Sequence, residues 1–163
     1  MKKLKTYLDT SIISFLYADD SPEKQEITKE FFSRYLQKYN VFISPLVLTE
    51  IENTRNIELK RKLKHVVEKF DLEILDIAGS DEDGLFNLAR KYVKKGIIPA
   101  GKFDDAMHIA ICVYYGFDIL LSWNFRHLAN INKQMAVNAF NRGQGYEKEL
   151  FLLNPMEVIY EKD

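Results

Sequence analysis

The sequence lacks several features that would point to particular classes of protein. Its 163 residues contain a single cysteine, Cys112, which excludes an intramolecular disulfide and a multi-cysteine zinc site. One cysteine also fits a reducing compartment, so we expect a cytoplasmic protein. Seven glycines and four prolines are too few for a linker-rich or collagen-like chain. No apolar run approaches the roughly 18 residues of a membrane span, and Asp9 interrupts the first apolar stretch too early for a signal peptide. We therefore expect no membrane association.

Charge of one sign is not in excess. The chain carries 23 basic and 24 acidic residues, a net charge of -1. This balance argues against a protein that coats nucleic acid by bulk charge. It does not exclude a nuclease, because acidic metal ligands and basic phosphate-binding residues cancel in the total. With 47% hydrophobic and 29% charged residues, we expect one globular domain over residues 1–163.

Short apolar segments alternate with amphipathic ones along the chain. This alternation predicts the α/β class, with a largely parallel sheet and right-handed crossovers. The expected strands are 4–8, 41–44, 72–77 and 118–122, and the expected helices begin at Pro22 and Pro45 and span 56–70, 81–95 and 103–115. Residues 132–146 contain two glycines and indicate a polar loop, and 157–160 indicate a last edge strand.

Acidic or amide side chains follow several of these predicted strands. Asp9 closes the first strand, Glu50 lies on the helix after the second, and Asn124 follows the fourth. Asp104 and Asp105 open the most regular predicted helix. Ligands bind at the carboxyl ends of strands in open α/β sheets, so these residues can converge at one edge although they are far apart in sequence.

Converging carboxylates repel one another and raise each other's pKa unless a cation holds them. Oxygen ligands without cysteine favour Mg²⁺ or Mn²⁺ over zinc or copper. Such an ion can polarise a phosphodiester and activate water.

Each acid also has a simpler interpretation. Asp9 could cap a helix, and Glu50 taken alone favours a surface acid. Of the adjacent pair, we expect Asp104 to be the N-cap and Asp105 the ligand, since Asp105 lies at the margin of the buried helix face. His108, one turn further on and closer to solvent, favours a structural or substrate-side role rather than a metal ligand.

Four motifs in this order resemble the PIN-domain nucleases, which include VapC-type toxin ribonucleases. They are YLDTSIISFL at 7–16, SPLVLTEI at 44–51, FDDAMHIA at 103–110 and ILLSWNFRHL at 119–128. The resemblance covers about the first 130 residues. It implies a three-layer α/β/α sandwich with a central, mainly parallel sheet, and Mg²⁺- or Mn²⁺-dependent cleavage of RNA.

Carried over by position, Asp9, Glu50 and Asp105 match the three core acids of the family. The fourth position is usually aspartate in the family, but here it is Asn124. Asparagine is a neutral oxygen ligand, which should weaken binding of a second cation. Alternatively, Asn124 caps the irregular segment 125–131.

The resulting hypothesis is an endoribonuclease that cleaves single-stranded RNA. One ion is held by Asp9 and Asp105, with Glu50 and Asn124 completing the shell directly or through water. The substrate-binding candidates are Ser11, Ser122, Arg126 and His127; the last two have the equal alternative of being solvated surface residues. The alternative function is a catalytically weakened PIN-like module that binds RNA or a protein.

A toxin of this type would have a small antitoxin protein as its partner, and we also expect a homodimer. Phe31, Phe32, Tyr35 and Tyr39 could form the docking groove for either, although core packing is the favoured use of most of them.

Overall fold

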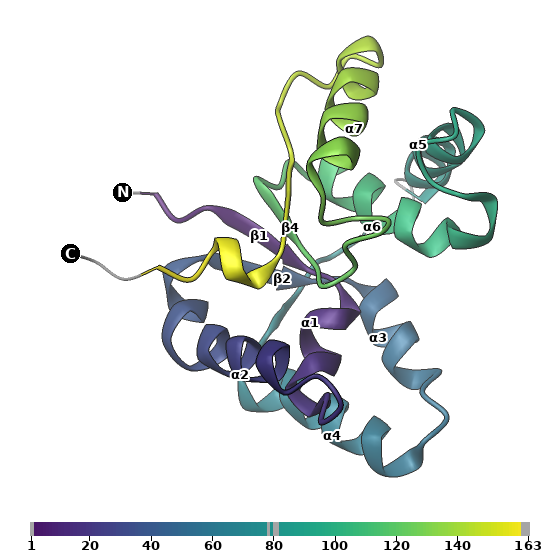
Figure 1. Cartoon of the computed structure of the whole chain (residues 1–163). Coiled ribbons are helices and arrows are strands. Elements are labelled where there is room, and N and C mark those ends of the chain that lie inside the picture. The colour runs from purple at the N-terminus through teal and green to yellow at the C-terminus, as the bar shows by residue number, and fades with distance from the viewer. Residues whose placement is uncertain (1, 78, 80–81, 161–163) are drawn as a thin grey trace.

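Five parallel strands form the centre of the fold (Figure 1). The computed structural model describes residues 2–77, 79 and 82–160. The strands lie in the order β3-β2-β1-β4-β5, and their bounds are β1 Lys5–Leu8, β2 Asn40–Ile43, β3 Glu73–Ile74, β4 Ile119–Leu121 and β5 Phe151–Leu153. Every neighbouring pair is parallel, which confirms the predicted sheet.

Helices cover both faces of this sheet. Helices α1 to α4 lie on one side in Figure 1 and α5 to α7 on the other, so the three-layer α/β/α sandwich is confirmed. Their bounds are α1 Thr10–Ser14, α2 Pro22–Glu30, α3 Pro45–Glu52, α4 Ile57–Lys69, α5 Glu82–Lys94, α6 Phe103–Tyr114 and α7 Ile131–Gly143. Shorter turns are the 3-10 segments Phe15–Tyr17, Leu36–Lys38, Ala100–Lys102 and Pro155–Glu157 and the π turn Phe31–Tyr35. Within the described ranges, no helix combines the length and apolar character needed to span a bilayer.

The central strands are buried on both faces, as their composition requires. All three residues of β4 are buried, and Tyr7 and Leu8 of β1 are fully inaccessible. A continuous apolar run suits a strand with helices on both sides, whereas a half-exposed strand would alternate with polar residues. Of the aromatic residues considered for a groove, Phe31, Phe32 and Tyr35 are buried and Tyr39 is partly buried, so they pack in the core.

The strand order creates a switch point between β1 and β4. The chain leaves β1 toward β2 and β3, then crosses through α5 and α6 to β4 on the other side of β1. Leu8 pairs with Leu121 at the ends of the two strands, and the Asp9 amide donates to the Leu121 carbonyl at 3.2 Å. Crevices at such points are where open α/β sheets bind ligands.

Two sequence predictions near the carboxyl end of the chain are wrong. Residues expected as a loop from 132 form most of α7, which Asn130 caps by accepting from the Lys133 amide at 2.8 Å. Asn138 is buried in this helix and bonds both the amide and the carbonyl of Leu150 at 2.9 Å. The last strand is β5, and no strand forms at the predicted residues 157–160. A 3-10 turn, Pro155–Glu157, ends at the first of these residues. The predicted start of α5 at residue 81 lies outside the described residues.

Candidate active site at the carboxyl edge of the sheet

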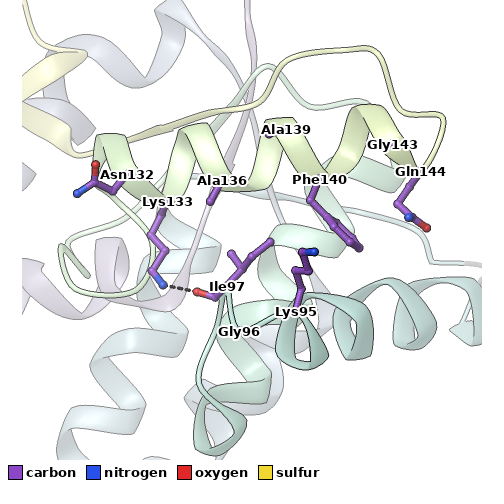
Figure 2. A pocket seen from close by; sticks show the side chains of 10 residues that line it. All are labelled: Lys95, Gly96, Ile97, Asn132, Lys133, Ala136, Ala139, Phe140, Gly143 and Gln144. Atoms are coloured by element: carbon purple, nitrogen blue, oxygen red, sulfur yellow. Dashed lines mark hydrogen bonds between the residues drawn. The ribbon is translucent and has the colours of Figure 1, made fainter.

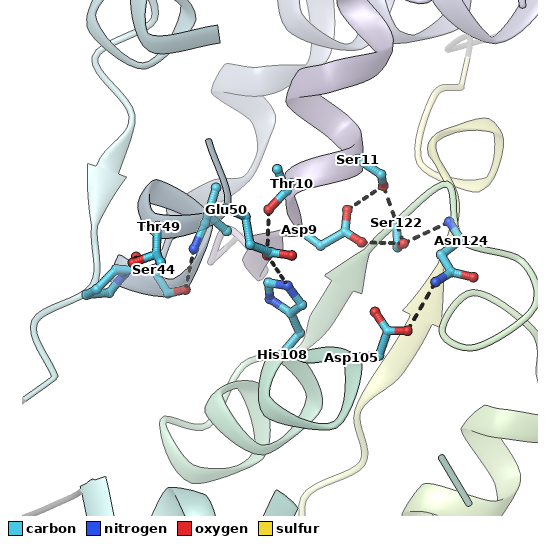
Figure 3. Close-up of polar contacts among 12 residues, drawn as sticks. Asp9, Thr10, Ser11, Ser44, Thr49, Glu50, Asp105, His108, Ser122 and Asn124 are labelled. Atoms are coloured by element: carbon cyan, nitrogen blue, oxygen red, sulfur yellow. Dashed lines mark hydrogen bonds and ion pairs between the residues drawn. The ribbon is translucent and has the colours of Figure 1, made fainter. Parts of the chain in front are cut away.

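A polar cleft of about 420 Å³ lies at the carboxyl edge of the sheet. Its lining combines acidic, basic and amide side chains from separate elements: Glu50, Ala100, Gly101, Lys102, Phe103, Asp104, Asp105 and Asn124. Asp9 lies beside the cleft, and Figure 3 shows its carboxylate near Ser122 and between Glu50 and Asp105. The acids that the sequence analysis selected are therefore brought together.

Asp9 is held from both sides by serine hydroxyls. Ser11 Oγ donates to Oδ1 at 2.5 Å and Ser122 Oγ donates to Oδ2 at 2.6 Å. The residue occupies the N-cap position of α1 but makes no side-chain capping bond, so the cap interpretation does not explain it. Burial raises the pKa of Asp9; the His108 charge and the two hydroxyl bonds partly oppose this, and the Glu50 charge adds to it.

Asp105 and Asn124 face each other across the cleft. Asn124 Nδ2 lies 3.4 Å from Asp105 Oδ2, at the outer limit of a hydrogen bond. Asn124 Oδ1 accepts from the His127 amide at 3.0 Å, so Asn124 also caps the turn that follows. Asn124 is therefore a cap, as the alternative interpretation held, and the same side chain also faces Asp105. Burial raises the pKa of Asp105, and the Glu50 charge contributes to the rise.

Glu50 is anchored, which rules out a simple surface acid. Its Oε1 accepts from Thr10 Oγ1 at 2.7 Å and lies 2.7 Å from His108 Nε2. Burial would raise the pKa of Glu50, but the hydrogen bond and charge of His108, together with the Thr10 bond, lower it overall. His108 is 2% exposed, so the expectation that it turns toward solvent is wrong. Burial would lower the pKa of His108, yet Glu50 and the two aspartates raise it overall.

The prediction that Asp104 is the helix N-cap is wrong. Helix α6 begins at Phe103, its N-cap residue is Lys102, and Asp104 lies exposed within the first turn. An acid there favours the helix dipole without capping the backbone. Asp105 is half-buried at the cleft, as predicted.

The predicted substrate-binding residues fall into two groups. Ser122 is fully buried, Ser11 is half-buried, and both hydroxyls donate to the Asp9 carboxylate and so position it. Their oxygens also accept the Trp123 and Asn124 amides at 2.9 Å, which ties the β4 end to α1.

Arg126 is exposed and His127 is half-buried on the turn after β4. Burial and the charges of Arg126, Lys133 and Lys102 lower the pKa of His127, and Asp105 partly opposes them. Of these basic residues, Lys102 lines the cleft. Lys102 was not predicted, although a basic residue just before a helix that opens with two acids is a usable signal.

The donor set fits a hard divalent cation. The described residues contain no preformed group of three His, Cys, Asp or Glu side chains at metal-ligand spacing. The oxygens nevertheless suit Mg²⁺ or Mn²⁺, which often binds one or two carboxylates directly and keeps several waters. The contact between Asp105 and Asn124 is 3.4 Å long and therefore weak. Asp9 and Asp105, with Glu50 and Asn124, are the residues that would hold the ion.

A larger pocket lies away from these acids. It measures about 730 Å³ between the end of α5 and α7 (Figure 2). Its lining includes Ile97, Phe140, Lys95 and Lys133, and no acidic residue. Lys133 Nζ donates to the Ile97 carbonyl and joins the two sides of the pocket. Because metal chemistry needs the carboxylates, the smaller polar cleft is the candidate active site.

A model of the PIN domain family matches residues 6–132, which include every one of these acids. The chain belongs to the PIN domain family. Members of this family are generally nucleases. No curated protein matches the sequence.

Among solved structures, the fold is similar to a chain in the crystal structure of VapBC2 from Rickettsia felis bound to a DNA fragment from its promoter. The TM-score is 0.51 at 19% sequence identity, and the match covers 91% of this chain and 97% of that one.

Proposed function

We propose that this PIN-domain protein is a Mg²⁺- or Mn²⁺-dependent endoribonuclease that cleaves single-stranded RNA. The convergence of Asp9, Glu50 and Asp105 on one polar cleft carries the proposal. The charge of Glu50 raises the pKa of both aspartates, so the three acids interact electrostatically. Crowded, partly buried carboxylates of this kind favour a bound cation.

The side chains divide the proposed work. Asp9 and Asp105 hold the ion, and Glu50 and Asn124 complete its shell directly or through water. A bound ion would polarise the scissile phosphate and activate water for in-line attack. Ser122 holds Asp9 in place through the 2.6 Å bond to Oδ2.

Basic residues on one rim of the cleft would bind the RNA backbone. Lys102 lines the cleft, and the charges of Lys102 and His127 act on Asp105, while Arg126 precedes His127 in the turn after β4. Phosphate contacts position a nucleic acid without reading its sequence. These basic residues support the proposal that RNA binds near the acids, and they would position its backbone without selecting a sequence.

Cleavage of a labelled single-stranded RNA in Mn²⁺ tests the activity. We expect cleavage by the native protein, none after addition of EDTA, and none by Asp9→Asn. Asp20→Asn, an exposed acid in the turn before α2, is the matched control and should cleave normally. Retained cleavage in Asp9→Asn, or cleavage that EDTA does not stop, would contradict the assignment.

A second function is favoured by one observation. Asn124 presents its amide nitrogen, rather than a carboxylate, toward Asp105. A site with one charge fewer suits a weakened PIN-like module that binds RNA or a protein without cutting. Calorimetric titration with Mn²⁺ separates the two, since a site that has lost its metal should give no heat of binding.

We also propose that the protein is the toxin of a toxin–antitoxin pair, that it acts in the cytoplasm and that it forms a homodimer. The family membership and the VapBC2 fold similarity support an antitoxin partner. A short reading frame beside this one, whose product co-purifies with the chain and stops RNA cleavage, would be the supporting result. The mass of the isolated chain in solution tests the dimer.

A further inference from the structure

A buried chain of hydrogen bonds ends on Glu50. Tyr7 OH lies 2.8 Å from Ser44 Oγ and 2.6 Å from His108 Nδ1. The opposite ring nitrogen, His108 Nε2, lies 2.7 Å from Glu50 Oε1. Tyr7 and Ser44 are fully buried and His108 is 2% exposed, so these polar atoms have no alternative partner in solvent. Buried polar groups that lose their partners are costly, which makes the chain hard to break locally.

The chemistry of Glu50 determines which atom donates in its hydrogen bond with His108. An ionised carboxylate accepts hydrogen bonds and cannot donate them, so His108 Nε2 must carry the proton it shares with Glu50. Tyr7 OH can either donate to Nδ1 or accept from it, depending on the charge of the ring. In both cases Nε2–H points at Glu50, and Tyr7 keeps the ring in this orientation.

Glu50 is fixed through one oxygen only. Oε1 accepts from both His108 and Thr10, while no described residue donates a hydrogen bond to Oε2. Glu50 lines the polar cleft together with Asp105 (Figure 3). A glutamate at the surface of a helix would otherwise sample several rotamers. Two bonds to Oε1 therefore leave Oε2 as the oxygen available to the cleft.

We propose that Tyr7 and His108 are positioning residues which, with Thr10, hold Glu50 by Oε1 and present Oε2 to the proposed metal site. The proposal rests on the proposed function, since Glu50 is there a metal ligand. Groups that orient metal ligands from behind commonly change metal affinity by 10- to 100-fold when removed. The spacing of His108 three residues after Asp105 places both on one helix without making His108 a ligand.

The test measures Mn²⁺ binding to the full chain by calorimetry. We expect His108→Gln to weaken binding by about 10- to 100-fold and Tyr7→Phe, which keeps the ring, by a smaller factor. Tyr92→Phe is the matched control, because Tyr92 is equally buried and donates to Asn141 at 2.6 Å, a bond that joins α5 to α7 and does not involve Glu50. It should lose stability but bind Mn²⁺ normally. In a Glu50→Gln background, Tyr7→Phe should have no further effect on affinity.

Unchanged Mn²⁺ affinity in folded Tyr7→Phe would overturn the proposal, as would an equal loss in Tyr92→Phe or a loss that persists in the Glu50→Gln background. Crystal structures of the Tyr7 and His108 variants test positioning without metal: Glu50 should leave its place or adopt several rotamers. Glu50 unmoved in both would also overturn the proposal. If the native protein binds no Mn²⁺ while Glu50 shifts in the variants, the metal function fails and the positioning role is supported.

Discussion

Replacing Asn124 by aspartate tests whether an added negative charge at position 124 repels Asp105 and strengthens metal binding. The change substitutes a carboxylate oxygen for the amide nitrogen that lies 3.4 Å from Asp105 Oδ2. The other oxygen of the new side chain can still accept from the His127 amide, now at 3.0 Å, so the turn cap survives. A weak attraction thus becomes a repulsion, with little change in volume and without loss of the cap.

The magnitude follows from Coulomb's law. Two unit charges about 4 Å apart interact by about 4 kcal/mol at an effective dielectric constant of 20. Both side chains are partly exposed and can rotate or take up a proton, so we expect about 1–2 kcal/mol of destabilisation at neutral pH without metal. For a chain of 163 residues this corresponds to a fall in Tm of about 2–8 °C. A bound divalent cation reverses the sign, so Mn²⁺ affinity should rise by about 5-fold or more.

Thermal unfolding with and without Mn²⁺ measures both effects. Asn124→Asp should melt below the native protein in EDTA and reach the native Tm or exceed it in Mn²⁺. Asn124→Ala, which loses the cap and about 1 kcal/mol of stability, should melt below the native protein in both conditions. The loss in EDTA should also vanish in an Asp105→Asn background. If Asn124→Asp melts like the native protein in EDTA and binds Mn²⁺ with unchanged affinity, Asn124 does not face Asp105 in solution and the reasoning is refuted.

Three further outcomes are expected. Lys102→Gln should weaken binding of single-stranded RNA and reduce the slope of log affinity against log salt concentration by about 0.7 for each phosphate contact that is lost. Lys3→Gln, at the opposite end of β1, should change neither the affinity nor the slope. Asp105→Ala should abolish Mn²⁺-dependent RNA cleavage, whereas Asp104→Ala should keep it and cost about 0.3–1 kcal/mol of helix stability; the reverse result would exchange their roles. Finally, burial would raise the pKa of Asp118, but bonds from the Lys5 amide and a lysine ammonium lower it overall. Its stabilisation is therefore present above the unfolded pKa of about 3.9 and lost as pH falls toward the folded value, so acid unfolding curves of native protein and Asp118→Asn should converge below that pH.

The strands β1, β2 and β4 were predictable because each contains an apolar run that ends before a polar residue, whereas β5 was not predicted. The expected strand 118–122 corresponds to β4, and Asp9 directly follows β1. Helix α7 was not predictable in the same way, because the buried residues Asn138 and Asn141 resemble loop residues in sequence. Their amides bond Leu150 and Tyr92, partners that only the folded chain brings near.

The acids of the site were predictable from their position in the sequence relative to the strands. An acid at a strand end is visible in sequence, since parallel strands send their carboxyl ends to one edge. The choice of Asp104 as the cap failed because helix α6 starts at Phe103, two residues earlier than that role requires. Errors of one or two residues at helix ends are common, yet they change which of two adjacent acids is the cap.

The polar groups that position the acids, such as the Tyr7 hydroxyl, lie in the core and could not be predicted from the sequence pattern. Tyr7 lies in the middle of a buried strand, where its ring satisfies the apolar pattern and its hydroxyl is invisible to periodicity. That hydroxyl still needs a partner, and the partner is His108, 101 residues away in the chain. A buried hydroxyl two residues before a candidate catalytic acid therefore indicates a second polar group nearby. The fold must bury the hydroxyl against such a group, and the nearest polar groups are those of the site.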